Sequence, residues 1–210
     1  MVAKFLNLEP EKQERILNAS MKEFAGKGYE QASTNAIVKE AGISKGLLFH
    51  YFQNKKQLYL FLYDYCLDLV VQDVFARMDL SETDFFQRLR QATQVKMELL
   101  RRYPELFRFL EEVYMEQAAE VKPELEGRHQ RLTEANMGRM FAGVDFSRFR
   151  EDLDLQKMLH VVVWTFEKFG EEELRKAKLS PVYAPDYDRM FAEAEEYFEV
   201  FITCFYKGKG

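Results

Sequence analysis

Hydrophobic positions return at helical spacing along most of the chain. In residues 9–27, 55–77 and 153–177, apolar side chains recur every three or four positions, which is the period of an α-helix with one buried face. Tracts with the same period cover residues 82–102, 105–119, 124–142 and 187–206. The alternation that is typical of strands does not appear. The pattern predicts an all-α protein whose helices are joined by short connections.

Residues 33–58 depart from this pattern because they contain two helices of about two turns each. Ser33 or Thr34 can cap the first helix with a side-chain oxygen. Gly42 then provides the left-handed backbone conformation that ends a helix, and Ser44 can cap the second helix. Two short helices with a glycine turn between them predict a helix-turn-helix.

The second of these helices has an inner and an outer face. Leu48 and Phe52 are four positions apart, so they should pack inward together. The positions left outside are Lys45, Gly46, Leu47, Phe49, His50 and Tyr51. Exposed rings beside a lysine are unusual on a solvated surface, and they suit contact with the polyanionic groove of DNA. The alternative is a small helical hairpin whose rings complete a core.

The same segment carries a recognisable motif. It reads T-x-x-I followed by A-G-I-S-K-G-L-L-F-H-Y-F-x-N-K-x-x-L, and it resembles the N-terminal DNA-binding domain of the TetR family of bacterial transcriptional regulators. Leu47 and Phe49 stand where family members often have Thr and Tyr. The resemblance covers residues 8–60, while the rest of the chain matches only in layout. It implies an N-terminal three-helix helix-turn-helix domain over residues 1–54, with a C-terminal helical bundle for effector binding and dimerisation over residues 55–210.

The resemblance also implies which residues contact DNA. They are Thr34, Asn35, Lys45, Gly46, Leu47, Phe49, His50, Tyr51 and Lys55. Lys45 is expected at a base edge, first of all guanine, or at a phosphate. Lys55 stands in the first turn of the following helix, where a helix N-terminus favours an anion. The alternatives are that Lys55 is a solvated lysine at a turn and that His50 lies at the rim.

Charge and composition agree with this arrangement. Residues 1–56 contain nine Lys or Arg and six Asp or Glu, a net charge of +3, and because the whole chain carries −5, the other residues carry −8. The hydrophobic fraction of 47% is ordinary for a soluble globular protein, and no apolar run approaches the roughly 20 residues that span a bilayer. A cytoplasmic protein is expected.

Cys66 and Cys204 fit no metal or redox spacing and are expected to be free and buried.

The last two helical tracts have apolar surface on more than one face. Such a helix must be covered twice, and a second copy of the chain is the simplest second cover. The resemblance implies the same homodimer through these helices. The residues expected at the dimer interface are Val161, Trp164, Met190, Tyr197, Phe201 and Phe205. The alternative is deep burial inside a monomer. A two-fold protein should bind a near-palindromic operator in double-stranded DNA.

The resemblance further implies an effector cavity in the middle of the chain, whose occupation tilts the helix over residues 55–77. Large side chains on helices expected to converge are the candidates for its lining: Phe61, Tyr65, Met97, Phe107, Leu110, Tyr114 and Trp164. Plain core positions are the alternative for each of them. The sequence has no cluster of arginines that would bind a phosphate group of an effector. We therefore expect a small apolar or aromatic effector, with or without a polar head.

These observations predict a sequence-specific DNA-binding transcriptional regulator, a repressor released by its effector. No catalytic motif is present, and His50, His129 and His160 lie in separate segments, so neither an enzyme nor a metal or cofactor site is expected. The alternative is a small-molecule or lipid carrier whose DNA-binding region is no longer functional.

Overall fold

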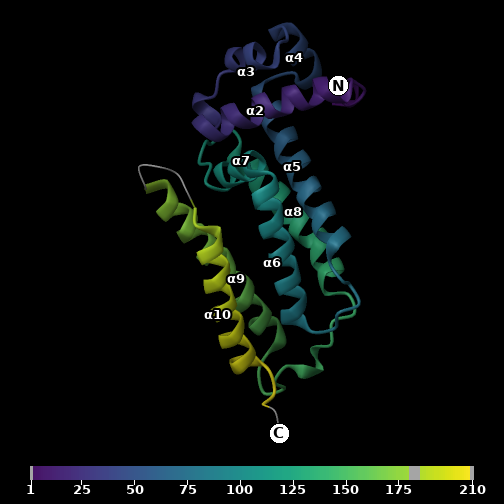
Figure 1. Cartoon of the computed structure of the whole chain (residues 1–210), viewed down its shortest axis with the longest axis vertical. Coiled ribbons are helices and arrows are strands. Elements are labelled where there is room, and N and C mark those ends of the chain that lie inside the picture. Colours follow the sequence, from purple (N-terminus) through teal and green to yellow (C-terminus); the bar gives the residue numbers. More distant parts are fainter. Residues whose placement is uncertain (1, 180–184, 209–210) are drawn as a thin grey trace. The chain divides into compact units, whose positions relative to one another are not determined.

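The structure is a computed structural model that describes residues 2–179 and 185–208 (Figure 1). Within these ranges the chain is helical, and no strand is present. The helices are α1 (Val2–Leu6), α2 (Pro10–Gln31), α3 (Thr34–Ala41), α4 (Lys45–Phe52), α5 (Lys55–Arg77), α6 (Phe85–Arg102), α7 (Pro104–Tyr114), α8 (Lys122–Phe141), α9 (Leu155–Leu179) and α10 (Tyr187–Phe205), with a 3₁₀ turn at Phe146–Arg148. The predicted fold class, all-α with an N-terminal helix-turn-helix and a C-terminal helical part, is confirmed. The sequence also places Pro181 between the last two helical tracts, and this residue lies outside the described residues.

The chain forms two compact units. Unit 1 contains the residues up to Asp73 together with Leu99–Met137, and unit 2 contains Val74–Glu98 together with the residues from Gly138 onward. Helices α5, α6 and α8 therefore each contribute residues to both units. None of the helices in the described part of the chain is long and apolar enough to cross a membrane. A functional boundary between residues 54 and 55 stays a prediction.

Unit 1 is built on α2, which packs against both α3 and α7. The residues predicted for its inner face are buried: Ile16, Leu17, Met21 and Phe24. The ring of Phe24 lies 4.8 Å from that of Tyr59 on α5, and Tyr59 lies 5.6 Å from Phe109 on α7, between ring centroids. Helix α7 thus shares a core with the N-terminal helices, although more than 70 residues separate α7 from α2.

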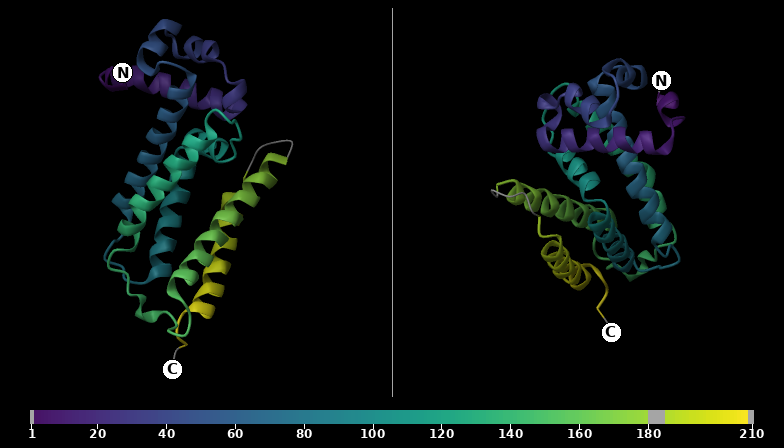
Figure 2. Two further views of the ribbon diagram at one scale, coloured as in Figure 1. Left: turned by 180° about the vertical axis from the view of Figure 1, so that it is seen from behind. Right: turned by 45° about the horizontal axis from the view of Figure 1, so that its top comes forward.

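Unit 2 has its own aromatic core. Its buried members are Phe85, Phe86, Phe149, Met158, Val162, Phe198, Phe201 and Tyr206. Helices α9 and α10 lie side by side in all views (Figures 1 and 2). Phe201 was expected at a dimer interface, but it is only 7% exposed and stacks on Phe86 at a centroid distance of 6.4 Å. That expectation is wrong because the inner face of α10 turns Phe201 towards α6.

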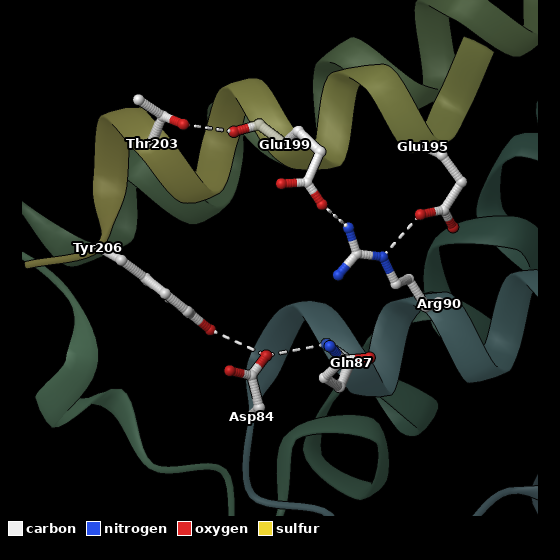
Figure 3. A network of polar contacts seen from close by, with 7 residues as sticks. All are labelled: Asp84, Gln87, Arg90, Glu195, Glu199, Thr203 and Tyr206. Carbon is white, nitrogen blue, oxygen red and sulfur yellow. Dashed lines mark hydrogen bonds and ion pairs between the residues drawn. The ribbon is translucent and has the colours of Figure 1, made fainter. Parts of the chain in front are cut away.

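Polar contacts fasten α10 to α6 inside unit 2 (Figure 3). Asp84 Oδ1 accepts a hydrogen bond from the backbone N–H of Gln87 at 2.9 Å and another from the Tyr206 hydroxyl at 3.2 Å. Six residues along α6, Arg90 pairs with Glu195 at 2.7 Å and also with Glu199. Asp84 therefore caps the start of α6 and at the same time anchors the chain beyond α10.

The two cysteines are free but differ in exposure. Cys66 is buried beside Met21, as expected, and burial raises the pKa of its thiol to about 12. Cys204 is exposed, so the expectation that both thiols are buried is wrong for this one. The apolar neighbours of Cys204 in the sequence lie on the inner face of α10, whereas Cys204 itself lies on the outer face.

Candidate nucleic-acid interface

The predicted helix-turn-helix is formed by α3 and α4, and its caps are those that the sequence indicates. The Ser33 side chain accepts a hydrogen bond from the N–H of Ala36 at 3.4 Å. Gly42 adopts the left-handed conformation with φ of 66°. The Ser44 hydroxyl accepts a hydrogen bond from the N–H of Leu47 at 3.2 Å. Each short helix is therefore bounded by local chemistry, which fixes the turn between them.

The outer face of α4 is largely the one that was expected. Leu48 and Phe52 are buried, whereas Lys45, Gly46 and His50 are exposed. The remaining outer positions, Leu47 and Phe49, are half-buried. Lys45 Nζ lies 5.9 Å from the centroid of the Phe49 ring, and a Cβ added at Gly46 would meet no other atom within 4 Å. Lys45 and His50 are thus exposed near the two ends of α4.

The expectation that Tyr51 faces outward is wrong. Tyr51 is only 5% exposed, because helix α1, which the sequence pattern did not predict, covers it. The centroid of the Phe5 ring on α1 lies 6.0 Å from that of Tyr51. The hydrophobic pattern could not reveal this contact, since α1 contains only five residues and shows too little of a helical period.

Lys55 also differs from its expected role. Its Nζ donates hydrogen bonds to the carbonyl oxygens of Glu30 at 3.0 Å and Ala32 at 3.4 Å, and it lies 4.6 Å from the centroid of the Tyr29 ring. Carbonyls at the end of a helix lack partners within the helix, so they attract a cation. In this structure Lys55 binds the end of α2, and its contact with a DNA phosphate stays a prediction. Thr34 is half-buried and Asn35 is exposed, both in the first turn of α3.

A carboxylate from the segment that follows α7 reaches the same end of α2. The sequence pattern predicted a helix over residues 9–27, whereas helical structure extends to Gln31 with a break at Gly28 (φ 67°, ψ −179°). Glu116 Oε2 accepts a hydrogen bond from the N–H of Tyr29 at 2.8 Å. Burial, followed by the nearby charge of Glu116, raises the pKa of the Tyr59 hydroxyl. Glu116 was missed because no local signal links it to Tyr29, 87 positions away.

The residues expected to line an effector cavity are divided between the units. Phe61, Tyr65, Phe107, Leu110 and Tyr114 belong to unit 1, whereas Met97 and Trp164 belong to unit 2. Phe61 packs its ring against Phe5 and Phe52, beneath α4, and Tyr65 follows at a centroid distance of 6.0 Å from Phe61. Phe107 is buried and Tyr114 is exposed. That these side chains line an effector cavity stays a prediction.

Unit 2 carries an open groove of about 480 Å³ between α9 and α10. Its lining includes Val161, Trp164, Phe169 and Tyr197. Trp164 is 63% exposed, and Val161 is exposed as well. Met190 and Phe205 are half-buried, and Phe205 stacks on Phe201. Exposed and half-buried side chains thus run along the outer faces of α9 and α10, where a dimer interface was expected.

Comparison with known proteins begins with the helix-turn-helix. Residues 16–61 match the model of the tetR family of bacterial regulatory proteins. The transcriptional activator FasR of Mycolicibacterium smegmatis is 33% identical over 84 residues, which are 40% of this chain and 38% of FasR. The chain spans only 20% to 38% of the length of the curated relatives that it matches.

The likeness to solved structures extends further than the sequence match. A TetR family transcriptional regulator from Chloroflexus aurantiacus matches with a TM-score of 0.64 and 21% identity, covering 98% of each chain. FadR from Bacillus subtilis, in complex with stearoyl-CoA, matches with a TM-score of 0.62 and 16% identity over 90% of this chain and 97% of FadR. Residues 16–61 therefore match the N-terminal segment of the tetR family of bacterial regulatory proteins, and the fold over nearly the whole chain is that of solved TetR family regulators.

Proposed function

We propose that the chain is a transcriptional regulator that binds specific sequences in double-stranded DNA through α3 and α4. The observation that carries the proposal is the open face of α4. It presents Lys45 and His50 on a helix whose opposite side, with Leu48 and Phe52, is held in the core. A helix held in this way keeps its outer side chains in a fixed position, which reading base edges in a groove requires.

The expected contacts follow from the position of each residue on the helix-turn-helix. The N-terminal residues of a recognition helix meet base edges, so Lys45 is assigned to guanine or a neighbouring phosphate, and Gly46 permits close approach of the backbone. Leu47 is assigned to a thymine methyl group or a sugar. Thr34 and Asn35 are assigned to the DNA backbone at the groove edge. Phe49 and His50 complete the set, while buried Tyr51 and engaged Lys55 are left out.

A homodimer is part of the same proposal. The outer faces of α9 and α10 offer exposed Trp164, Val161 and Val200, which a second copy would cover. A two-fold dimer would place its recognition helices in successive major grooves only if they lie about 34–36 Å apart. The operator is therefore expected to be near-palindromic.

The test is selection of binding sites from a pool of random DNA duplexes at two salt concentrations. We expect enrichment of a near-palindrome whose affinity falls as salt rises, because phosphate contacts release counterions. In Lys45→Ala, binding to the enriched duplex should weaken by about 1–3 kcal/mol, with relaxed specificity at one base pair of each half-site.

A matched control is Lys122→Ala, which removes a lysine from α8 in the same unit, far along the chain from the helix-turn-helix. It should leave the affinity for the enriched duplex unchanged. A pool that yields no enriched sequence, with weak binding at both salts, would overturn the proposal. The lipid or small-molecule carrier would then be the better description.

We further propose that an effector with an acyl or aromatic group controls DNA binding. The chain would then act as a repressor that leaves its operator when the effector binds. FadR from Bacillus subtilis, which shares the fold, is seen with stearoyl-CoA. Stearate and stearoyl-CoA are the first probes. At a hundredfold excess over its Kd, a ligand adds about 2.7 kcal/mol to the free energy of unfolding, which should raise Tm by roughly 5–10 °C.

The measurement for the effector combines thermal unfolding, native mass spectrometry and binding to the enriched duplex. A rise in Tm together with a bound mass and weaker DNA binding would support release by the ligand. Stronger DNA binding with either ligand would contradict release from DNA by the ligand. If neither ligand adds mass or changes Tm, the acyl effector is excluded.

A further inference from the structure

Helix α1 is fixed against the helix-turn-helix by one aromatic side chain. Phe5 is fully buried, and its ring centroid lies 4.9 Å from that of Phe52 on α4 and 5.5 Å from that of Phe61 on α5. Burial of the whole phenylalanine ring stabilises this contact through the hydrophobic effect. The short helix therefore has a defined position on α4, although a helix of five residues has little stability of its own.

The turn after α1 is held by hydrogen bonds as well. Gln13 Nε2 donates to the carbonyl oxygens of Leu6 at 3.1 Å and Leu8 at 2.7 Å. The N–H of Leu8 donates to the carbonyl oxygen of Phe5 at 3.0 Å. Three hydrogen bonds and a buried ring thus determine where α1 presents its exposed side chains.

Lys4 is the exposed residue that this arrangement places beside the recognition helix. Its Nζ lies 3.3 Å from Nε2 of His50, 46 positions away in the chain. An ammonium group can only donate, so the ring nitrogen accepts from it in this contact. The two side chains bring two nitrogen atoms to one point on the outer face of α4, near its C-terminal end.

The partner of Lys4 differs in kind from the partners of three other lysines of unit 1. Lys22 pairs with Glu40 at 2.7 Å, Lys27 pairs with Glu23 at 2.8 Å, and Lys56 pairs with Glu124. A carboxylate neutralises each of these ammonium groups. The contact that the structure records for Lys4 is to an imidazole, which leaves the positive charge of Lys4 uncompensated.

We propose that Lys4 and His50 together bind one phosphate of the DNA backbone, so that α1 is a part of the DNA-binding surface. The inference rests on the proposed function. A phosphate oxygen accepts from the ammonium group of Lys4, and it accepts from Nε2 of His50 in the tautomer that carries the ring proton on that nitrogen. A phosphate between the two side chains thus replaces the contact that they make with each other. Because base edges are met by the first residues of a recognition helix, a pair near its last turn suits the backbone at the edge of the groove.

The test measures the salt dependence of binding to the enriched duplex and to a shuffled duplex of the same length, for the wild type and for Lys4→Ala. Loss of one phosphate contact per chain removes two contacts from a bound dimer. At 0.1 M salt, each lost contact should lower affinity roughly fivefold to tenfold, and together they should reduce the slope of log K against log salt by about two. Both duplexes should be affected equally, because a phosphate contact carries no sequence information.

Three further variants separate the phosphate contact from other effects. Lys4→Arg keeps the charge and should retain the wild-type slope. Lys122→Ala removes a lysine from α8 and should change neither affinity nor slope. In His50→Ala, the added loss from Lys4→Ala should be smaller than in the wild type, because the two residues share one phosphate. Lys4 is exposed, so an unchanged Tm in Lys4→Ala excludes unfolding as the cause.

Three results would overturn the inference, and the proposed function fails in only the last of them. If the wild type binds DNA with salt-sensitive affinity but Lys4→Ala has the same affinity and slope, Lys4 does not contact the phosphate and the proposed function stands. If Lys4→Ala weakens binding to the enriched duplex alone, Lys4 reads sequence and the phosphate assignment is wrong. If the wild type binds neither duplex, the proposed function fails, and the contact fails with it.

Discussion

Replacing Arg88 by alanine is expected to lower the free energy of unfolding of the second unit by about 3–5 kcal/mol. Arg88 is fully buried at the start of α6. Its guanidinium group donates hydrogen bonds to the carbonyl oxygens of Met140 at 3.0 Å and Ala142 at 2.6 Å, at the end of α8. It also donates to those of Leu80 at 2.8 Å and Glu82, in the connection between α5 and α6.

The expected effect is large because four carbonyl groups share this donor. Carbonyls at the end of a helix and in an irregular loop have no regular partner, and a buried one without a hydrogen bond costs about 1–3 kcal/mol. Alanine would leave these oxygens around a cavity. Water entering the cavity would offset part of the loss, which keeps the total below the sum of four such costs.

Urea unfolding of Arg88→Ala, Arg88→Lys and Arg77→Ala would test this role. Lysine keeps the charge, but a single ammonium group cannot reach four carbonyls in the geometry of a guanidinium fork, so Arg88→Lys should also lose most of the stability. Arg77 pairs with Glu98 at the surface, where such pairs contribute about 0–1 kcal/mol, so Arg77→Ala is the control. Equal unfolding midpoints for Arg88→Ala and Arg77→Ala would contradict the role of Arg88.

The parts of the fold that the sequence predicted well are those governed by local signals. Ser33, Gly42 and Ser44 act within four residues of their own positions, and the structure has each cap where it was expected. Leu48 and Phe52 repeat with the helical period, so their burial could be inferred from spacing alone. Local hydrogen bonds and periodicity are encoded in short stretches, which a single sequence contains in full.

The errors concern side chains whose surroundings come from distant segments. Tyr51 looks outward on a helical wheel, but Phe5 covers it from 46 positions away. Lys55 stands at a helix N-terminus, where an anion is favoured, but its Nζ donates hydrogen bonds to carbonyl oxygens at the end of α2. Phe201 belongs to a stripe wider than one core, and spacing could not tell which edge of the stripe faces α6. In each case tertiary packing decides among faces that the sequence leaves equivalent.

Replacing Gly28 by alanine is expected to lower the free energy of unfolding by about 1–3 kcal/mol. The backbone at Gly28 has φ of 67° and ψ of −179°, a region that essentially only glycine adopts. An added Cβ would lie 3.3 Å from Glu112 Oε1 and 3.6 Å from Glu116 Oε2. The cost therefore combines backbone strain with a tight contact against the carboxylate of Glu112.

Gly26→Ala is the matched control, two residues away in the same helix. A Cβ at Gly26 would meet no other atom within 4 Å, and Gly26 lies in the regular part of α2. There alanine should raise the free energy of unfolding by about 0.5–1 kcal/mol, because it lowers the conformational entropy of the unfolded chain. Both substitutions replace glycine by alanine, but they should change the free energy of unfolding, measured with urea, in opposite directions.

The position of Gly28 gives this substitution a second consequence. The break directs the N–H of Tyr29 to Glu116 at 2.8 Å, and Lys55 binds the carbonyls just beyond it, so α7 and α5 both hold the end of α2 through this segment. If alanine straightens the break, the Tyr29 amide should exchange with solvent faster in Gly28→Ala than in Gly26→Ala. Under the proposed function DNA affinity should fall too, since α3 begins directly after this segment. Equal amide exchange and equal unfolding midpoints in the two variants would show that the break does not depend on glycine.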